Sequence, residues 1–383
     1  MRGRGPGRRG GERTLKPRAG HVDGTHLAIV LIVAMSANGF LALPRFVALR
    51  AGGAGWLAMG LGALVALAGL TLLVTALARF RGQGLVGVAA EVAGPVVGRL
   101  LVLPLFLYFL ADTALTGREF AENLYLALLP NTPVPVTAAV LLGLAGATAS
   151  LGLETLVRAA MLWSLIIALF LVPLLASFVT LADFSNLTPL WGPGLGSLAI
   201  QGWKDSGLYP EYLLLGVVAP LVRRRQELWR AGALAIGGTW LVLASLSVLT
   251  VAVLSPEGAA RLSFPVFVLA RSVALGRFLE RVEAVFVFLF FLALTLRKSV
   301  TLLGAAFLLA GSLDLGHHRP LVPALTVLAY GLSFVPLSVT EAAALDFTVI
   351  REVLWVLVVG LPLALLALAA GRRKGGGGAA RSR

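Results

Sequence analysis

Long apolar runs separated by short loops occupy most of residues 27–371. Backbone groups in lipid must hydrogen-bond within the protein, so such runs cross a membrane as helices, and no alternation of a membrane β-barrel is visible. A crossing needs about 20 mostly apolar residues, and this length predicts an all-α integral membrane protein of about ten transmembrane helices. The predicted spans are 27–49, 55–78, 98–126, 134–150, 155–180, 201–222, 228–254, 281–311, 320–338 and 350–371.

Composition supports the membrane assignment. Hydrophobic residues make up 58% of the chain and charged residues only 13%, a balance unlike that of soluble proteins. The chain has no cysteine, which excludes disulfides, thiol catalysis and Cys-ligated metal. Gly82–Gly87 has the spacing of a dinucleotide motif, but it follows a membrane run with no βαβ unit around it. We therefore expect neither an enzyme activity nor a cofactor.

The net charge of +14 is concentrated at the two ends of the chain. Lys and Arg are enriched on the cytoplasmic side of membrane proteins, so both ends are expected there, which requires an even number of spans. We expect a disordered basic tail at 1–21, a single permease-like domain at 22–371 and a second basic tail at 372–383. Lys298 and Arg319 are also expected on the cytoplasmic side. The ends lack interleaved aromatic residues, which argues against nucleic-acid binding.

Two of the runs are interrupted by small and polar residues. Ser36–Gly39 interrupts the first run, and Ser206–Glu211 interrupts the sixth. These are matching positions of two five-helix halves, at about 27–180 and 201–371, and paired interruptions indicate a solute site near the membrane midplane. Helix N-termini attract a carboxylate and freed carbonyls attract an ammonium group, so an amino acid suits such a site. The alternative is a kinked packing helix whose Gly39 admits a neighbour.

Ionisable residues inside apolar runs are further candidates. A polar stripe on the third run either lines a pathway or holds the helix to its neighbours, and it consists of Tyr108, Asp112, Thr113 and Thr116. Asp112 lies near the predicted membrane centre. Glu211 either faces a cavity or pairs with Lys204. For several other polar residues, a structural role is an alternative to ligand binding. Thr295 could bond its own helix, and Arg118, Glu119 and Glu122 are read as end residues that reach the interface.

Four stretches resemble one protein family. They are Leu128–Pro133, Gly152–Arg158, Asp183–Leu190, and Phe264-Pro265 with Gly276–Ala284, where Glu283 replaces a more usual Asp. In this order they resemble the permease-like B subunit of the nutrient germinant receptors of endospore-forming bacteria, which belongs to the amino acid–polyamine–organocation superfamily. The resemblance covers roughly residues 22–371. The long Arg/Gly-rich amino tail is unusual for it.

The resemblance implies a LeuT-like 5+5 inverted repeat with broken helices 1 and 6. It implies a subunit that senses a small amino-acid-like ligand in the spore inner membrane or cell membrane, beside a subunit with large soluble domains and a lipoprotein subunit. Alternatives are a proton-coupled amino acid transporter and a scaffold with a vestigial site. By their position in the family's pattern, the interruption residues and Thr295 are also expected to line the ligand cavity. The combined candidates are Ser36, Asn38, Gly39, Phe40, Tyr108, Asp112, Ser206, Gly207, Leu208, Tyr209, Glu211 and Thr295.

Overall fold

A computed structural model describes residues 23–37, 39, 42–80, 82–127, 129–222, 224–272 and 282–379. Two predicted ligand residues, Asn38 and Phe40, lie outside these ranges, as does the predicted tail at 1–21. Every regular element within the described ranges is helical. Six helical stretches there are long and apolar enough to cross a membrane, and four apolar helices are shorter.

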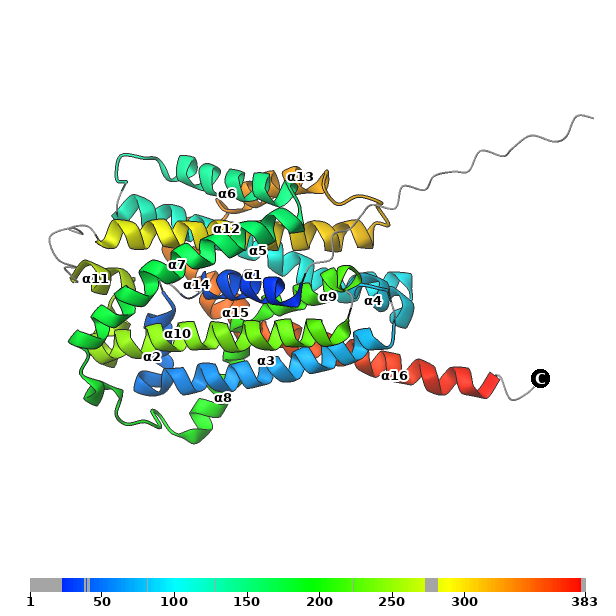
Figure 1. Ribbon diagram of the computed structural model, residues 1–383, viewed down its shortest axis with the longest axis horizontal. Helices are drawn as coiled ribbons and strands as arrows, with labels where there is room; N and C mark the ends of the chain where they lie inside the picture. Colours follow the sequence, from blue (N-terminus) through cyan, green and yellow to red (C-terminus); the bar gives the residue numbers. More distant parts are fainter. Residues whose placement is uncertain are drawn as a thin grey trace, which may run out of the picture.

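The elements follow the predicted spans with differences at their ends (Figure 1). In chain order the α-helices are α1 (Gly24–Ala37), α2 (Leu43–Ala51), α3 (Gly55–Ala78), α4 (Leu85–Ala93), α5 (Pro95–Ala127), α6 (Val134–Ser150), α7 (Leu153–Leu181), α8 (Leu195–Asp205), α9 (Leu214–Val218), α10 (Arg225–Arg261), α11 (Pro265–Ser272), α12 (Val282–Ser312), α13 (Leu321–Leu332), α14 (Val339–Ala344), α15 (Arg351–Val353) and α16 (Leu361–Ala379).

Sequence explains several of these boundaries. Pro95 begins α5 directly after Gly94, whose φ of 88° is accessible to glycine. Pro133 precedes α6, which spans the residues expected for the fourth run. Helix α10 changes direction at Ser255, which has a φ of 60° and precedes Pro256, a residue that disfavours helix before it.

The ninth and tenth runs differ from expectation. Helix α13 ends at Leu332, not near 338, and its last carbonyls accept from the backbone of Ser333. The last run is helical from Val339 onward and contains two π-helical segments, η6 (Leu345–Ile350) and η7 (Val356–Gly360). Such segments widen a helix locally and often occur at functional sites. Helix α16 continues through residue 379, so the start of the predicted basic tail is helical.

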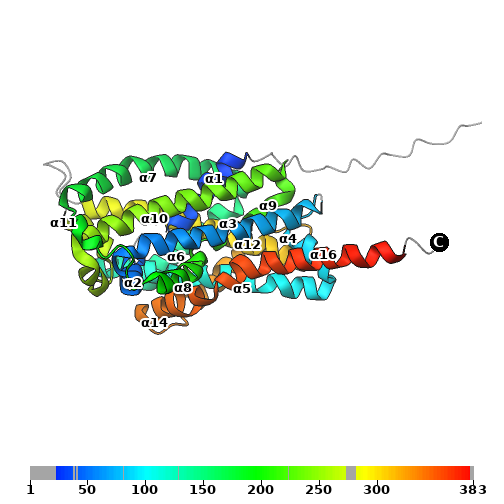
Figure 2. The same ribbon diagram turned by 90° about the horizontal axis from the view of Figure 1, so that it is seen from below.

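Helix α1 lies at the centre of the bundle. It contacts α10 on one side and α12 on the other, and α7 also packs on it. Helix α10 in turn packs on α3 and α2, and α12 packs on α5 and α6. Figures 1 and 2 show α11 and α2 toward one end of the bundle, and the last turns of α16 at the opposite end.

Both interrupted runs lose regular α-helix. Helix α1 ends at Ala37 and α2 begins at Leu43, with the Gly39 amide donating to the Ser36 carbonyl at 3.0 Å. A Cβ on Gly39 would lie 2.4 Å from a methyl group of the Leu243 side chain, so a larger residue here would require that side chain to shift. After α8 the chain forms two 3-10 turns, η3 (Ser206–Leu208) and η4 (Pro210–Leu213).

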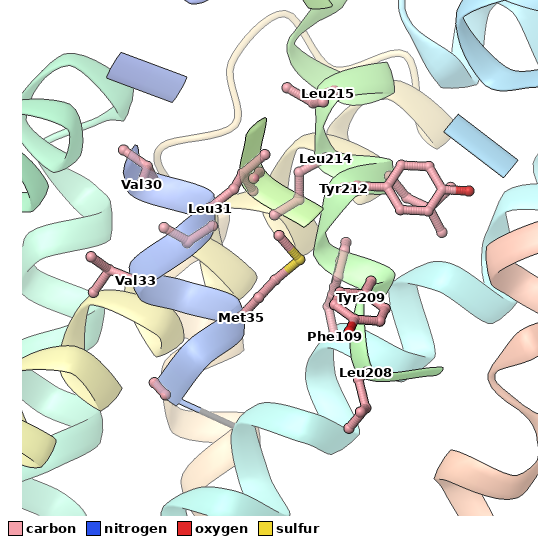
Figure 3. Packing of buried hydrophobic residues seen from close by; sticks show 14 of the residues in the cluster. Val30, Leu31, Val33, Met35, Phe109, Leu208, Tyr209, Tyr212, Leu214 and Leu215 are labelled. Carbon is pink, nitrogen blue, oxygen red and sulfur yellow. The ribbon is translucent and has the colours of Figure 1, made fainter. Parts of the chain in front are cut away.

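The η3–η4 segment is held by buried tyrosines beside α1. Figure 3 shows Met35 of α1 pointing toward this segment, with Tyr209 and Tyr212 beyond it. The Tyr209 hydroxyl donates to the Met59 carbonyl of α3 at 3.1 Å, and the Tyr212 hydroxyl donates to the Val358 carbonyl of η7. A segment with few α-helical hydrogen bonds is therefore anchored by its side chains.

Candidate functional site

Arg297 of α12 brings three predicted site residues together. Its Nη2 atom lies 2.7 Å from Asp112 Oδ1 and 2.6 Å from Glu211 Oε1, and 3.5 Å from the Tyr108 hydroxyl. Its Nη1 atom donates to the Ala34 carbonyl at 3.1 Å. One guanidinium thus joins α1, α5, η4 and α12 at the centre of the bundle. Sequence analysis did not identify Arg297.

Lys298 completes this cluster, and its predicted position was wrong. Its Nζ atom lies 2.6 Å from Asp112 Oδ2 and 2.9 Å from the Asp112 carbonyl oxygen. The side chain is 0% exposed, so Lys298 is not a cytoplasmic topology charge. Residues 297 and 298 lie in the middle of the predicted eighth run. A charge at that depth is itself a sign of function, and this signal was available in the sequence.

We call Asp112, Glu211, Arg297 and Lys298 the charge cluster. All four side chains are at most 1% exposed. Two carboxylates balance two cations, so the formal charge of the cluster is zero. Removing such charges from water costs several kcal/mol per ion, and good mutual geometry is needed to offset that cost. The hydrogen bonds that Arg297 and Lys298 donate to Asp112 supply that geometry, whereas the two Glu211 oxygens accept no hydrogen bond from any described residue.

The remaining stripe residues of α5 serve two purposes. Thr113 and Thr301 share a hydroxyl hydrogen bond of 2.9 Å across the α5–α12 contact. Thr116 donates to the Asp112 carbonyl at 2.6 Å and also lines a cavity. The stripe therefore both holds α5 to α12 and reaches an internal space.

Other predicted residues lie around the cluster without joining it. Thr295 donates to the Phe291 carbonyl of its own helix, which is the plain alternative foreseen for it. Ser206 likewise bonds the Trp203 carbonyl. Ser36 is buried and lines an apolar groove between α1 and α7, and its hydroxyl has no hydrogen-bond partner in the described part of the chain.

Gly207 and Leu208 line a separate small pocket, together with Lys204 and Arg351. A Cβ on Gly207 would lie 3.0 Å from the Arg351 carbonyl oxygen, so glycine allows α15 to approach. Lys204 pairs with Glu352 of α15, not with Glu211, because Glu211 is turned inward to Arg297. The alternative pairing of Lys204 and Glu211 was therefore wrong.

A cavity of about 260 Å³ lies beside the charge cluster. Its walls come from α2, α5, α12, α14 and the residues just before α11, so it lies toward the α11 end of the bundle (Figure 2). Ala37, at the end of α1, and Thr116 belong to its lining, and they lie one helical turn from Ala34 and Asp112 respectively. Much of its wall is aromatic or aliphatic: Phe46, Phe120, Phe264, Phe290 and Leu294.

Two polar side chains of α5 face this cavity. Glu119 and Asn123 line it, at i+3 and i+7 from Thr116. Glu119 Oε1 and Asn123 Oδ1 are buried and accept no hydrogen bond from any described residue. Interpreting Glu119 as an interface residue was wrong, because it lies inside the bundle. Its spacing from Asp112 and Thr116 continued the polar stripe and could have indicated this position.

Two cationic side chains also line the cavity. Arg45 of α2 contributes a buried Nε that has no hydrogen-bond partner among the described residues. Arg351 of α15 bonds Asp346 of η6 through Nε at 3.2 Å and Nη2 at 3.0 Å. Acceptors on α5 and donors on α2 thus face a shared space with apolar walls.

Comparison with known proteins identifies the family. The profile described as Spore germination protein, the spore permease family, matches residues 22–342. Two relatives from Bacillus subtilis (strain 168) are 24% identical to this chain. Spore germination protein YfkT aligns over 60% of this chain and 63% of its own length, and spore germination protein B2 over 64% and 67%. The chain thus spans just under two thirds of the first relative.

Solved transporters share the fold. MhsT in complex with L-phenylalanine has a TM-score of 0.63 at 17% identity, covering 89% of this chain and 88% of MhsT. Mhp1, a nucleobase-cation-symport-1 family transporter, has a TM-score of 0.59 at 14% identity and 92% coverage of both chains. These likenesses establish the fold of LeuT-like transporters for this membrane protein. Because the family profile matches most of its length, the chain belongs to the spore germination protein family of permease-like membrane proteins.

Proposed function

We propose that this protein is the germinant-sensing membrane subunit of a spore nutrient receptor. It binds a small amino-acid-like ligand in the cavity beside the charge cluster and signals to partner subunits. Family membership supports the receptor setting. The observation that carries the proposal is a pair of buried acceptors, Glu119 Oε1 and Asn123 Oδ1, which have no partner among the described residues and face a cavity of about 260 Å³.

The cavity chemistry suits a zwitterion. A ligand ammonium fits against the Glu119 carboxylate and the Asn123 carbonyl, and a ligand carboxylate fits against Arg45, which lines the same cavity. Buried acceptors without partners are costly, so a ligand donor that satisfies them gains affinity. Phe120, Phe290 and the other apolar wall residues would take the ligand side chain. The likeness to MhsT, solved with L-phenylalanine, agrees with this class of ligand.

The residues that line the proposed ligand cavity are mostly not the ligand residues predicted from the sequence. The helix interruptions border the site, through Ala37 at the end of α1, but the ligand contacts we propose come mainly from α5 and α2. The two interrupted segments act in the proposal as adjustable neighbours of the cavity, which the first of them reaches through Ala37. Their backbone carries little regular helix, so it changes conformation at a lower cost than a continuous helix when the cavity is filled.

The charge cluster next to the cavity favours sensing over transport. The charge cluster fills the space between α1, η4, α5 and α12 with close-packed ion pairs. Passage of a ligand would require these buried contacts to separate in every cycle. Filling the cavity instead biases the position of α1 and η4, and a ligand shifts such an equilibrium by its differential affinity for the two states.

We further propose the setting inferred from the sequence. The permease-like domain is 22–371, built of two inverted five-helix repeats in the spore inner membrane or cell membrane, with both basic ends cytoplasmic. Its partners are a receptor subunit with large soluble domains and a lipoprotein subunit. The family supports these assignments.

The test separates binding from accumulation. Purified protein in liposomes receives labelled amino acids with and without an imposed pH gradient. Saturable binding without accumulation supports the sensor. Accumulation that disappears when the gradient is collapsed would establish the second candidate, a proton-coupled amino acid transporter, which is favoured by the ionisable Asp112 and Glu211 at the bundle centre.

A matched pair of variants locates the binding site. Glu119→Gln removes the carboxylate charge, and a charge-assisted hydrogen bond contributes about 1.5–3 kcal/mol, so affinity should fall roughly tenfold to a hundredfold. Glu122→Gln makes the same change one turn along α5, where Glu122 pairs with Arg118, and should leave affinity unchanged. Equal effects of the two substitutions would place the ligand elsewhere.

A further inference from the structure

The end of α1 presents a carbonyl of the kind that binds cations. Helix α1 ends at Ala37, and the last four carbonyls of a helix have no partner within it. Ala34 is one of these four residues. In transporters with interrupted helices, such carbonyls and helix C-termini coordinate the coupling cation.

Two carboxylates complete the acceptor set around this carbonyl. Arg297 touches Asp112 Oδ1 at 2.7 Å, Glu211 Oε1 at 2.6 Å and the Ala34 oxygen at 3.1 Å. Carboxylate and backbone carbonyl oxygens are the ligands that hard metal cations take in proteins. These oxygens come from α5, η4 and α1, so whatever cation lies among them fixes the relative positions of three elements.

We propose that the Arg297 guanidinium is a tethered cation that replaces an inorganic cation such as Na⁺ at the end of α1. Lys298 occupies the second oxygen of Asp112 and brings the cluster to zero charge. The protein therefore reaches its folded, ligand-competent state without Na⁺. The guanidinium positions the end of α1, which lines the ligand cavity at Ala37.

A simple structural bridge predicts something different. If Arg297 only fills space, its removal destabilises the protein whatever ions are present. If it stands in for a cation, its removal leaves an anionic oxygen site that a soluble cation can occupy. Rescue by an added cation is the readout that separates these two roles.

The test measures the thermal unfolding midpoint of the purified full-length protein in nanodiscs. Na⁺ is exchanged for choline at constant ionic strength, and guanidinium is titrated at concentrations far below those that denature. We expect no response from the wild type. Arg297→Ala should have a lowered midpoint that rises saturably with guanidinium and, to a smaller extent, with Na⁺.

Control variants keep the result decisive. Arg158→Ala removes an exposed cation that pairs with Glu154 and should show no cation response. Arg297→Lys keeps a charge and should stay independent of Na⁺, which gives a second measurement if Arg297→Ala does not fold. A Na⁺-dependent midpoint in the wild type or in Arg297→Lys overturns the proposal, as does a folded Arg297→Ala that no cation restores. The readout involves no ligand, so it stands apart from the test of the proposed function.

Discussion

Arg297 and Asp112 meet through two contacts, at 2.7 Å from Nη2 and 3.4 Å from Nε, although they are 185 positions apart in the chain. Both side chains are at most 1% exposed. A planar guanidinium matches a carboxylate at two points, which makes the pair directional as well as strong. The pair joins α5 to α12. The bond from Arg297 to the Ala34 carbonyl joins both helices to the last turn of α1.

Asp112→Asn should destabilise the protein severely. The substitution leaves Arg297 and Lys298 buried with one carboxylate too few, and breaking a buried pair in this way costs about 3–5 kcal/mol. Chemical or thermal unfolding in detergent measures this loss. Asp314→Asn is the matched control because Asp314, which pairs with Arg99, has an 83% exposed side chain. It should change stability by less than about 1 kcal/mol, and similar losses in both variants would show that the cluster is not buried.

Blocking the cavity should abolish ligand binding without unfolding the protein. Thr340 is an exposed residue of α14 at the cavity wall, so Thr340→Trp adds bulk from the rim and leaves the core unchanged. We expect saturable amino acid binding to disappear while the unfolding midpoint stays within error of the wild type. Thr340→Ser is the control for loss of the native side chain. Normal binding by the Trp variant would exclude this cavity.

Gly62 should not tolerate a methyl group. A Cβ there would lie 2.7 Å from the Asp205 carbonyl carbon and 2.8 Å from the Ser206 amide nitrogen, both backbone atoms. Gly62→Ala should therefore push α3 away from the start of η3 and lower the unfolding midpoint. At Gly143 of α6 a Cβ would meet no described atom within 4 Å, so Gly143→Ala should be neutral or stabilising by up to about 1 kcal/mol. A neutral Gly62→Ala would mean that α3 and η3 are not in close contact.

His318 should titrate below its usual range. Burial, with help from Arg319 and His317, lowers the pKa of its imidazole, which stacks on Phe307 at a centroid distance of 3.9 Å. The folded state then binds its proton less readily than the unfolded state. This contribution to stability is present above about pH 6.5 and is lost as pH falls through the folded pKa. NMR titration of labelled histidine measures it, and Phe307→Ala should raise the pKa of His318; an unchanged pKa would rule out shielding by Phe307.

Local sequence accounts for much of the helical framework. The bounds of α3 and α6 agree with the apolar runs because each run is framed by residues that begin or end helices, such as Pro133 before α6. The end of α13 was harder to place. Apolar composition continued to residue 338, while the α-helix ended at Leu332 and gave way to a turn in which the Phe334 and Val335 amides bond carbonyls three residues back. Apolar content alone therefore locates a span but not its last turn.

The candidate site could be predicted only in part. Asp112 and Glu211 stood out because a carboxylate in an apolar run is costly to bury. Arg297 and Lys298 carried the same signal, but Arg297 was overlooked and Lys298 was assigned to the cytoplasmic side. Glu119 was assigned to the interface because it lies near the end of its run, although its spacing from Asp112 and Thr116 continued the polar stripe.

By itself, the sequence determined that this chain resides in a membrane as a bundle of helices. Apolar runs of spanning length have no other stable arrangement in lipid, because every backbone group must be paired within the protein. Only the tertiary structure decided which charges meet. Asp112, Glu211 and Arg297 lie on separate elements, and their pairing depends on how those elements pack. Distant residues become neighbours through packing, which the local sequence pattern does not encode.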